Sequence, residues 1–298
     1  MIEKFKGVIP AILSPTDAQG ALSVKPIAKM IRFFRETGCE GVFVGGSSGE
    51  GFFLTEAERK RLAEAVVKEC QGAMPAVIHV GQIDQRVAVS LAKHAGKIGA
   101  AGVSSVMPFY YGYTLQEARA YYQAIADASG LPLIIYVYSG ASSIKFTPQA
   151  FVDEMCRIRS LVGIKYTVLS VHEMQAMQLL SGGRLRTFGG WDEIALPYLS
   201  MGCDGIIGTN YNYMPEPFVA LYRAFRAGDM PAAMRAQERM TKVLLDFANI
   251  SPVERAKAGC RVRGLDVGKP RPPMSWPTKE TLAFMKKTLA AEGLRTIR

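Results

Sequence analysis

The stretch VGIKYT, residues 162–167, has the composition of a short β-strand. Alternate residues of a strand face opposite sides, so Lys165 lies between Gly163 and Thr167 on an enclosed face of small residues. An amine on such a face loses solvation of its charged form, which lowers its pKa. A neutral amine attacks ketones and can form a Schiff base. The alternative is a lysine at a strand end, with its ammonium in solvent or paired with a carboxylate.

Seven similar β-rich segments accompany this stretch, and their starts are 20 to 35 residues apart. In chain order, the eight segments are Val8–Leu13, Gly41–Gly46, Ala76–Gly81, Gly102–Met107, Pro132–Tyr138, Val162–Thr167, Leu185–Gly190 and Gly205–Asn210. Helical periodicity lies between most of them, and Thr55 and Glu58 form a capping-box signature at the start of one helix. Apolar strands alternating with helices indicate a parallel sheet, and eight units predict a (β/α)8 TIM barrel. A doubly wound sheet is the alternative, but no strand is followed by G-x-G-x-x-G.

The last part of the chain lacks this alternation of strand and helix. Helical stretches around Met230–Asn249 and Thr278–Leu294 flank the proline-rich segment Lys269–Pro277. We therefore predict a barrel over residues 1–225 and a helical extension over residues 226–298 that packs on it.

The chain carries an excess of basic residues, since 36 Lys and Arg minus 26 Asp and Glu leave a formal charge of +10. This excess favours an anionic partner, either a small acidic substrate, a nucleic acid or a membrane surface. The densest basic cluster lacks interleaved aromatic residues and is interpreted as a solvated surface, so we expect no nucleic-acid partner. It consists of Arg255, Lys257, Arg261, Arg263, Lys269 and Arg271.

We expect a cytoplasmic protein. The five cysteines are widely spaced and show no metal or disulfide pattern, which fits a reducing compartment. No secretory signal core and no apolar run of membrane-spanning length is found, so we also expect no membrane partner.

The carboxyl ends of the predicted strands carry polar side chains, and in a barrel these ends hold the chemistry. A Gly/Ser loop, GGSSGE at residues 45–50, could bind an anion such as a carboxylate, although a plain turn is at least as common. Tyr136 could move protons beside Lys165 or could serve only in packing. Asp192 and Glu193 could bind sugar hydroxyls or could simply begin a helix. His79 is interpreted as a satisfied core residue, and His94 and His172 have no partners at metal-ligand spacing.

Six motifs together resemble the pyruvate-dependent class I aldolases that include N-acetylneuraminate lyase and dihydrodipicolinate synthase. They are GGSSGE (45–50), PFYY (108–111), IIYVY (134–138), GIKYT (163–167), GGWDE (189–193) and GTNYN (208–212). The resemblance implies that Lys165 is the Schiff-base lysine and Tyr136 the proton-relaying tyrosine. It also implies that Ser47 and Ser48 bind the pyruvyl carboxylate. Tyr110 matches a tyrosine that a neighbouring subunit lends to the relay, which implies a homo-oligomer built as a dimer of dimers.

Three of these motifs, PFYY, GGWDE and GTNYN, are closer to the lyase branch than to the synthase branch. The resemblance implies that substrate contacts come from Ser48, Gly46, Thr167, Gly190, Asp192, Glu193, Gly208 and Thr209, and that the enzyme needs no cofactor or metal. Residues 137–139 depart from the Asn-x-Pro usual after the strand-five tyrosine, and residues 139–143 contain no arginine for a second carboxylate.

The substrates implied are pyruvate with an aldehyde, or the 2-keto-3-deoxy sugar acid that they form, with an uncharged distal end. Two alternatives use the same imine, namely dihydrodipicolinate-type condensation and sugar-acid dehydration. A third alternative is a barrel that binds an anion without catalysis.

Overall fold

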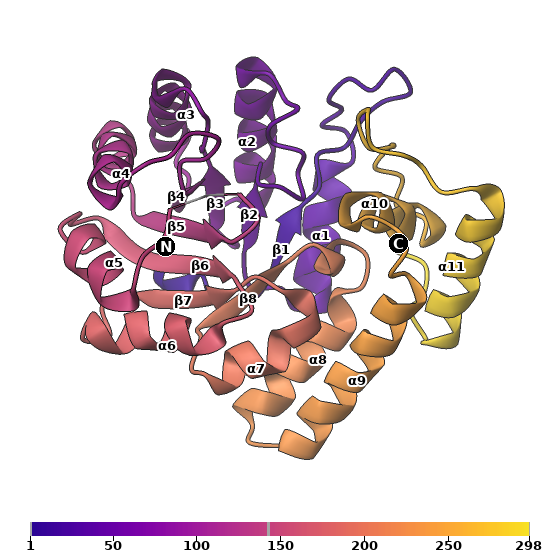
Figure 1. Cartoon of the computed structure of the whole chain (residues 1–298). Coiled ribbons are helices and arrows are strands. Elements are labelled where there is room, and N and C mark those ends of the chain that lie inside the picture. Colours follow the sequence, from indigo (N-terminus) through magenta and orange to yellow (C-terminus); the bar gives the residue numbers. More distant parts are fainter. Residues whose placement is uncertain (1, 142–143, 298) are drawn as a thin grey trace.

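Eight parallel strands form a closed barrel in the computed structural model, which describes residues 2–141 and 144–297 (Figure 1). The strands are β1 (Gly7–Ile12), β2 (Val42–Val44), β3 (Ala76–His79), β4 (Gly102–Val106), β5 (Leu133–Tyr138), β6 (Leu161–Thr167), β7 (Arg186–Gly189) and β8 (Gly205–Gly208). Each strand pairs with the next in the sequence, and β8 pairs with β1, Val8 lying opposite Ile206. The TIM barrel predicted from the sequence is confirmed.

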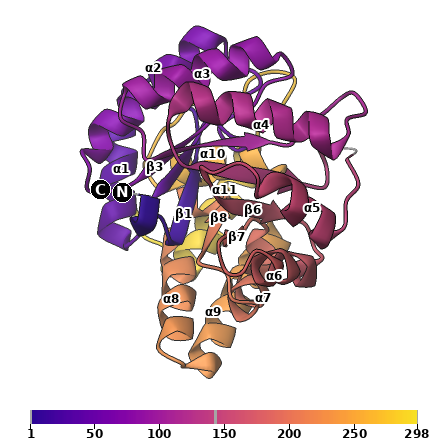
Figure 2. The ribbon, with the colours of Figure 1, turned by 90° about the vertical axis from the view of Figure 1, so that its left-hand side faces the viewer.

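A helix follows each strand and lies on the outside of the barrel (Figures 1 and 2). These helices are α1 (Ile27–Thr37), α2 (Glu56–Cys70), α3 (Gln85–Lys97), α4 (Leu115–Ser129), α5 (Pro148–Met155), α6 (Val171–Leu180), α7 (Ala195–Ser200) and α8 (Pro215–Arg226). The predicted capping box at α2 is present: Thr55 accepts from the Glu58 backbone N–H, and the Glu58 side chain accepts from the Thr55 backbone N–H.

The buried apolar side chains form two layers. The inner layer fills the barrel and contains Phe5, Phe43, Tyr136 and Phe188. The outer layer lies between the strands and the helices, where Ile164 and Tyr166 of β6 contribute. The strand face that carries Lys165 is therefore the inner one, as the alternation of residues 163–167 predicts. Val162 departs from that alternation and packs with the inner layer, because the β5–β6 register shifts there.

Three further helices follow the barrel: α9 (Met230–Asp246), α10 (Pro252–Val262) and α11 (Lys279–Ala291). Helices α8 and α9 lie side by side and extend away from the barrel (Figures 1 and 2). Helix α10 packs against the short 3₁₀ turn Asn210–Asn212 after β8. The sequence analysis predicted α9 and α11 but not α10. The division at residues 225 and 226 falls at the end of α8 and stays a prediction.

The interpretation of the basic cluster as a solvated surface is wrong for half of its members. Arg255, Lys257 and Arg263 are 6%, 0% and 4% exposed. Each is paired with an acid: Lys257 with Glu50 at 2.8 Å, and Arg263 with Glu216 at 2.7 Å. Arg255 has a longer pair, at 3.9 Å, with Glu193. Small residues between them, Ala256, Ala258 and Gly259, allow α10 to be buried, because a Cβ at Gly259 would collide with the Tyr213 ring.

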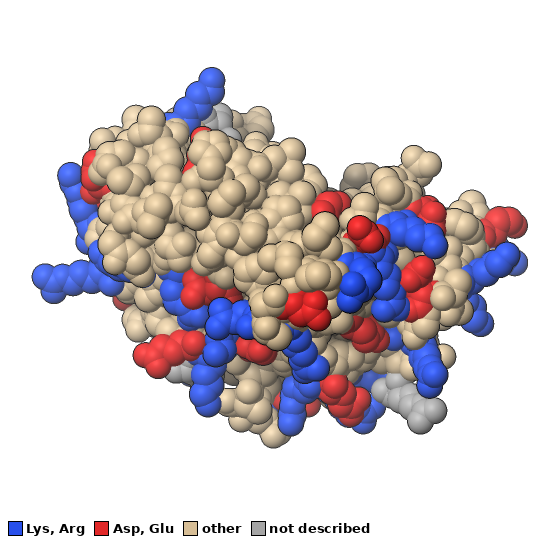
Figure 3. Space-filling view, turned by 90° about the horizontal axis from the view of Figure 1, so that it is seen from below, with Lys and Arg blue, Asp and Glu red and all other residues tan. Residues whose placement is uncertain are grey.

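The remaining charges do not form a continuous basic surface on the face shown in Figure 3, where basic and acidic side chains are interspersed. Within the described part of the chain, no helix combines the length and the apolar character needed to cross a membrane.

Candidate active site

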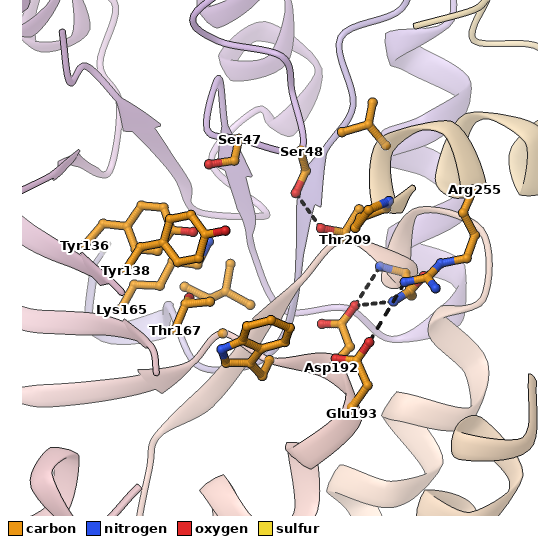
Figure 4. A pocket seen from close by; sticks show the side chains of 16 residues that line it. Ser47, Ser48, Tyr136, Tyr138, Lys165, Thr167, Asp192, Glu193, Thr209 and Arg255 are labelled. Atoms are coloured by element: carbon orange, nitrogen blue, oxygen red, sulfur yellow. Dashed lines mark hydrogen bonds and ion pairs between the residues drawn. The ribbon is translucent and has the colours of Figure 1, made fainter. Parts of the chain in front are cut away.

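A cavity of about 250 Å³ opens at the carboxyl ends of the strands and is shown in Figure 4. The predicted site residues that line it are Ser47, Ser48, Tyr136, Lys165, Thr167, Gly190, Asp192, Glu193 and Thr209. Lys165 and Tyr136 lie on one side of the cavity in Figure 4, and Asp192 and Glu193 lie on the other. The structure thus brings together side chains that are up to 162 positions apart, from Ser47 to Thr209.

The Lys165 amine is enclosed by aromatic rings and is 5% exposed. Its Nζ lies 4.0 Å from the Tyr136 ring centroid and 4.6 Å from that of Phe43. Burial lowers the pKa of this amine to about 7, and the charge of Asp192 opposes the shift. At neutral pH a large fraction of the amine is therefore uncharged. The alternative of a lysine with a solvated ammonium is wrong, because the side chain is buried.

Tyr136 is buried next to Lys165 on the neighbouring strand, and the two residues are opposite each other in the β5–β6 register. Burial raises the pKa of its phenol, which therefore keeps its proton at neutral pH. Tyr138, two residues along β5, also lines the cavity, and its ring is stacked on Tyr136 with centroids 5.9 Å apart. Two phenols thus face the cavity where the sequence analysis assigned one.

Hydrogen bonds and one ion pair join the Gly/Ser loop to other parts of the chain. Ser48 shares a hydrogen bond of 2.6 Å with the Thr209 hydroxyl, which joins the loop to the end of β8. Glu50, two residues further on, is 3% exposed, accepts from Lys257 at 2.8 Å, and accepts from the Arg271 backbone N–H at 2.9 Å. The Ser47 side chain is exposed in the cavity, where it interacts with the Tyr136 phenol.

Asp192 and Glu193 begin the 3₁₀ helix Asp192–Ile194, as one interpretation of the sequence allowed, but Asp192 does not face solvent, since it is 4% exposed. Its Oδ2 accepts from the backbone N–H of Asn210 at 2.9 Å and from the Asn210 amide at 2.6 Å. Its Oδ1 is buried and has no hydrogen bond of normal geometry among the described residues, and the Tyr211 phenol interacts with the same carboxylate. Asp192 lines the cavity, and Figure 4 shows its side chain at the wall opposite Lys165. Burial and the charge of Glu193 raise the pKa of Asp192 to about 6. The carboxylate therefore offers an acceptor to a ligand at neutral pH.

Two predicted glycines contribute space rather than contacts. A Cβ at Gly208 would collide with the Asp192 carboxylate, and one at Gly46 would come within 2.7 Å of the Phe43 ring. Neither glycine lines the cavity. Gly190 does, and a Cβ there would collide with the Thr167 hydroxyl.

Tyr110 does not line the cavity of its own chain. Its side chain is 81% exposed, and its backbone has a φ of +78°, which is rare for a tyrosine.

Sequence reasoning missed Trp191, Asn210 and Arg255, all of which line the cavity. The Trp191 Nε1–H is buried and has no acceptor among the described residues. The Thr167 hydroxyl is also buried, and it has no hydrogen bond of normal geometry there. Trp191 and Asn210 stand inside quoted motifs and could have been found there. Arg255 comes from α10, outside the strand–helix alternation, where no local pattern pointed to the cavity.

His79 is a buried residue with its hydrogen bonds satisfied, as predicted, whereas His94 has a carboxylate partner that the sequence spacing did not indicate. His79 is 2% exposed, and its Nε2 accepts from the Val106 backbone N–H at 3.0 Å. His94 pairs with Glu64 at 2.8 Å on the outer helices. Among residues 2–141 and 144–297, no group of three or more His, Cys, Asp or Glu side chains is placed to hold a metal ion.

Comparison with known proteins finds a family and relatives that match nearly the whole chain. The profile of the Dihydrodipicolinate synthetase family matches residues 4–292. The N-acetylneuraminate lyase of Rhizobium meliloti is 31% identical over 96% of this chain and 95% of its own length. The N-acetylneuraminate lyase of Citrobacter koseri is 33% identical over 82% of each chain.

Solved structures extend the similarity. The wild-type sialic acid aldolase of Ruminococcus gnavus superimposes with a TM-score of 0.92 at 26% identity, covering 98% of this chain and 99% of that one. A prophage protein of the dihydrodipicolinic acid synthase family from E. coli K12, solved with pyruvate, gives a TM-score of 0.90 at 27% identity. That comparison covers 97% of this chain and 99% of the other.

Proposed function

This chain belongs to the Dihydrodipicolinate synthetase family, and from that premise we propose that it is a pyruvate-dependent class I aldolase of the N-acetylneuraminate lyase type. The substrate is a 2-keto-3-deoxy sugar acid, which the enzyme cleaves to pyruvate and an aldehyde. The observation that carries this proposal is the buried Lys165 amine, whose pKa is lowered to about 7 and which lies beside Tyr136 in the cavity.

The first chemical step is attack of the neutral Lys165 amine on the C2 ketone of the substrate. The Tyr136 phenol donates its proton to the carbinolamine hydroxyl, which leaves as water, so that a protonated imine and a phenolate result. The protonated imine attracts electrons more strongly than the ketone does. The hydroxyls of Ser47 and Ser48 bind the C1 carboxylate during this step. Thr209 orients Ser48, since the two hydroxyls are 2.6 Å apart.

Carbon–carbon cleavage follows. The Tyr136 phenolate left by the preceding dehydration accepts the proton of the C4 hydroxyl as the C3–C4 bond breaks, and the electron pair of that bond moves into an enamine. The aldehyde leaves, C3 takes up a proton, and water hydrolyses the imine to release pyruvate and free Lys165. Burial raises the pKa of Tyr136, so the phenol returns to its neutral form after each turnover.

The far side of the cavity favours a hydroxylated and uncharged distal end. The carboxylates of Asp192 and Glu193 both line this side of the cavity. Both attract hydroxyl donors and repel a carboxylate. Arg255, which the sequence analysis did not place here, adds one positive charge to this wall, but it is already engaged with Asn210 and Glu193.

We also propose a dimer of dimers in the cytoplasm, with no nucleic-acid or membrane partner. The exposed Tyr110 supports lending of this residue to a neighbouring subunit, and the large apolar side chains Tyr111, Phe52 and Phe53 nearby in the strand-end loops are 59%, 42% and 47% exposed. The five free cysteines support a reducing compartment. Sedimentation equilibrium checks the assembly: a fourfold mass is expected, and a monomer would contradict it.

The test of function is a screen of 2-keto-3-deoxy sugar acids for pyruvate release, with N-acetylneuraminate among them. A parallel reaction offers aspartate semialdehyde and pyruvate. Pyruvate release from a sugar acid is the expected result. Faster reaction with the semialdehyde would support the synthase alternative, and release of water without pyruvate would support the dehydratase alternative.

A further inference from the structure

A buried chain of hydrogen bonds runs from α10 to Asp192. The Arg255 Nε–H donates to Asn210 Oδ1 at 3.1 Å, and the Tyr213 hydroxyl donates to the same oxygen at 3.1 Å. The Asn210 amide nitrogen then donates to Asp192 Oδ2 at 2.6 Å. All four residues are buried, with exposures of 0% to 6%. Figure 4 shows the Arg255 side chain pointing toward Asp192 and Glu193 from the far wall of the cavity.

These contacts allow only one orientation of the Asn210 amide. Its oxygen faces two donors, and its nitrogen faces a carboxylate. A flipped amide would place an N–H against the arginine and an oxygen against the carboxylate, so both contacts would become repulsive. A guanidinium has donors and no acceptor, so Arg255 cannot accept from a flipped amide.

We propose that Arg255 and Asn210 form a positioning relay that holds the Asp192 carboxylate, through its Oδ2, at the wall of the cavity, where this carboxylate accepts from a ligand. Arg255 is therefore a specificity-determining residue for substrates whose distal group donates a hydrogen bond. The inference rests on the proposed function, and it adds that Arg255, a residue from outside the barrel, favours substrates with hydroxyl donors.

The charges around Asp192 give Arg255 a second effect. The titratable groups that face this carboxylate are Glu193 beside it, Lys165 of β6, Tyr136 of β5, Tyr211 and Tyr213 after β8, and Arg255 of α10. Burial is the main cause that raises the pKa of Asp192 to about 6, and Glu193 adds to it, while Asn210 and Arg255 act in the opposite direction. Removing Arg255 therefore raises that pKa further and reduces the ionised fraction at neutral pH.

The test compares two substrates that differ only beyond the reacting carbons. N-acetylneuraminate, with 2-keto-3-deoxygluconate as a second probe, carries distal hydroxyls. 4-Hydroxy-2-oxopentanoate has none. The ratio of their kcat/KM values cancels the titration of Lys165, which both substrates share, and leaves the contribution of the distal wall.

In the wild type this ratio is expected to rise with pH through a midpoint near 6, as Asp192 ionises. In Arg255→Met the midpoint should move up by about one pH unit. The ratio at pH 8 should also fall about fivefold to tenfold, because Asn210 is no longer held. Arg255→Lys keeps the charge and should recover the midpoint in part.

Two further variants separate positioning from a loss of folding. Arg263→Met removes another buried arginine, at the C-terminal cap of α10. This arginine pairs with Glu216 and does not line the cavity, so its loss should leave the midpoint unchanged. Asn210→Asp keeps the acceptor for Arg255 and Tyr213 but places a carboxylate against Asp192, so it should raise the midpoint more than Arg255→Met does.

An equal midpoint in wild type and Arg255→Met, or an equal shift in Arg263→Met, overturns the relay. A wild type that forms a pyruvate adduct but cleaves neither hydroxylated probe overturns it as well. A wild type that forms no pyruvate adduct contradicts the proposed function instead.

Discussion

The buried ion pair between Lys257 and Glu50 joins the helical extension to the Gly/Ser loop of the site, and its removal should have a large effect. The two side chains are 0% and 1% exposed and are 2.8 Å apart. Lys257 also donates to the Lys269 carbonyl at 2.9 Å, so one ammonium joins α10, the Gly/Ser loop and the proline-rich segment. We expect Lys257→Met to lower both the stability of the protein and its affinity for pyruvate.

The magnitude follows from what remains after the substitution. Methionine fills a similar volume, but it leaves the Glu50 carboxylate buried with only the Arg271 backbone N–H as a donor. Removing one partner of a buried ion pair typically costs about 3–5 kcal/mol. Solvent does not screen this pair, because both side chains are buried. A fall in Tm on the order of 10 °C is expected for a chain of this size.

The assay is thermal and urea unfolding of Lys257→Met, Glu50→Gln and the double variant, with KM for pyruvate measured in the variants that fold. The double variant should be more stable than Lys257→Met, because it removes the unpaired charge. Arg261→Met is the matched control on the same helix. Its pair with Asp266 is 34% and 64% exposed, so its loss should cost less than about 1 kcal/mol. The reasoning is refuted if Lys257→Met is as stable as the control, or if the double variant gains nothing.

The remaining predictions concern the cavity itself. Tyr136→Phe should lower kcat by about 10²–10⁴-fold while imine formation with pyruvate stays detectable by borohydride trapping, and turnover within a factor of a few of wild type would assign the proton transfer to another group. The rate of imine formation should rise with pH through about 7, since the reactive form of Lys165 is the neutral amine, and a rise centred near pH 10 would show an amine of ordinary pKa. Asp192→Ala should reduce kcat/KM for the sugar acid, and the reduction should correspond to a loss of about 1–3 kcal/mol in transition-state binding, with no such loss for 4-hydroxy-2-oxopentanoate. Gly208→Ala should have a similar selective effect, because its methyl group would displace the Asp192 carboxylate, and a crystal structure of the variant checks whether that carboxylate has moved.

The barrel could be predicted because its strands are short β-rich segments that recur every 20 to 35 residues, and because helical periodicity lies between most of them. Lys165 could be placed on the inner face from the alternation of residues 162–167 alone. The roles assigned to Tyr136 and the two serines came from family resemblance. The structure brings all of these residues to one cavity, and their roles remain proposals.

The residues of α10 could not be placed in the same way. Lys257 pairs with a residue 207 positions away, and Arg255 contacts Asn210 at a separation of 45. Nothing in the local pattern of residues 252–263 distinguishes a buried, paired arginine from a solvated one. The partners become visible only when the extension is folded onto the barrel. Tyr110 presents the opposite case, since its expected partner lies outside a single chain.

Covalent capture of pyruvate tests the central claim most directly. Wild type and Lys165→Arg are each incubated with pyruvate and sodium borohydride, and intact mass and peptide mapping are measured. Reduction converts an imine into a stable secondary amine, so wild type should gain one reduced pyruvyl group per chain, located on Lys165. Lys165→Arg should gain none, because a guanidinium stays protonated and does not attack a ketone. An adduct of equal yield on the arginine variant, or an adduct mapped to another residue, would contradict the account.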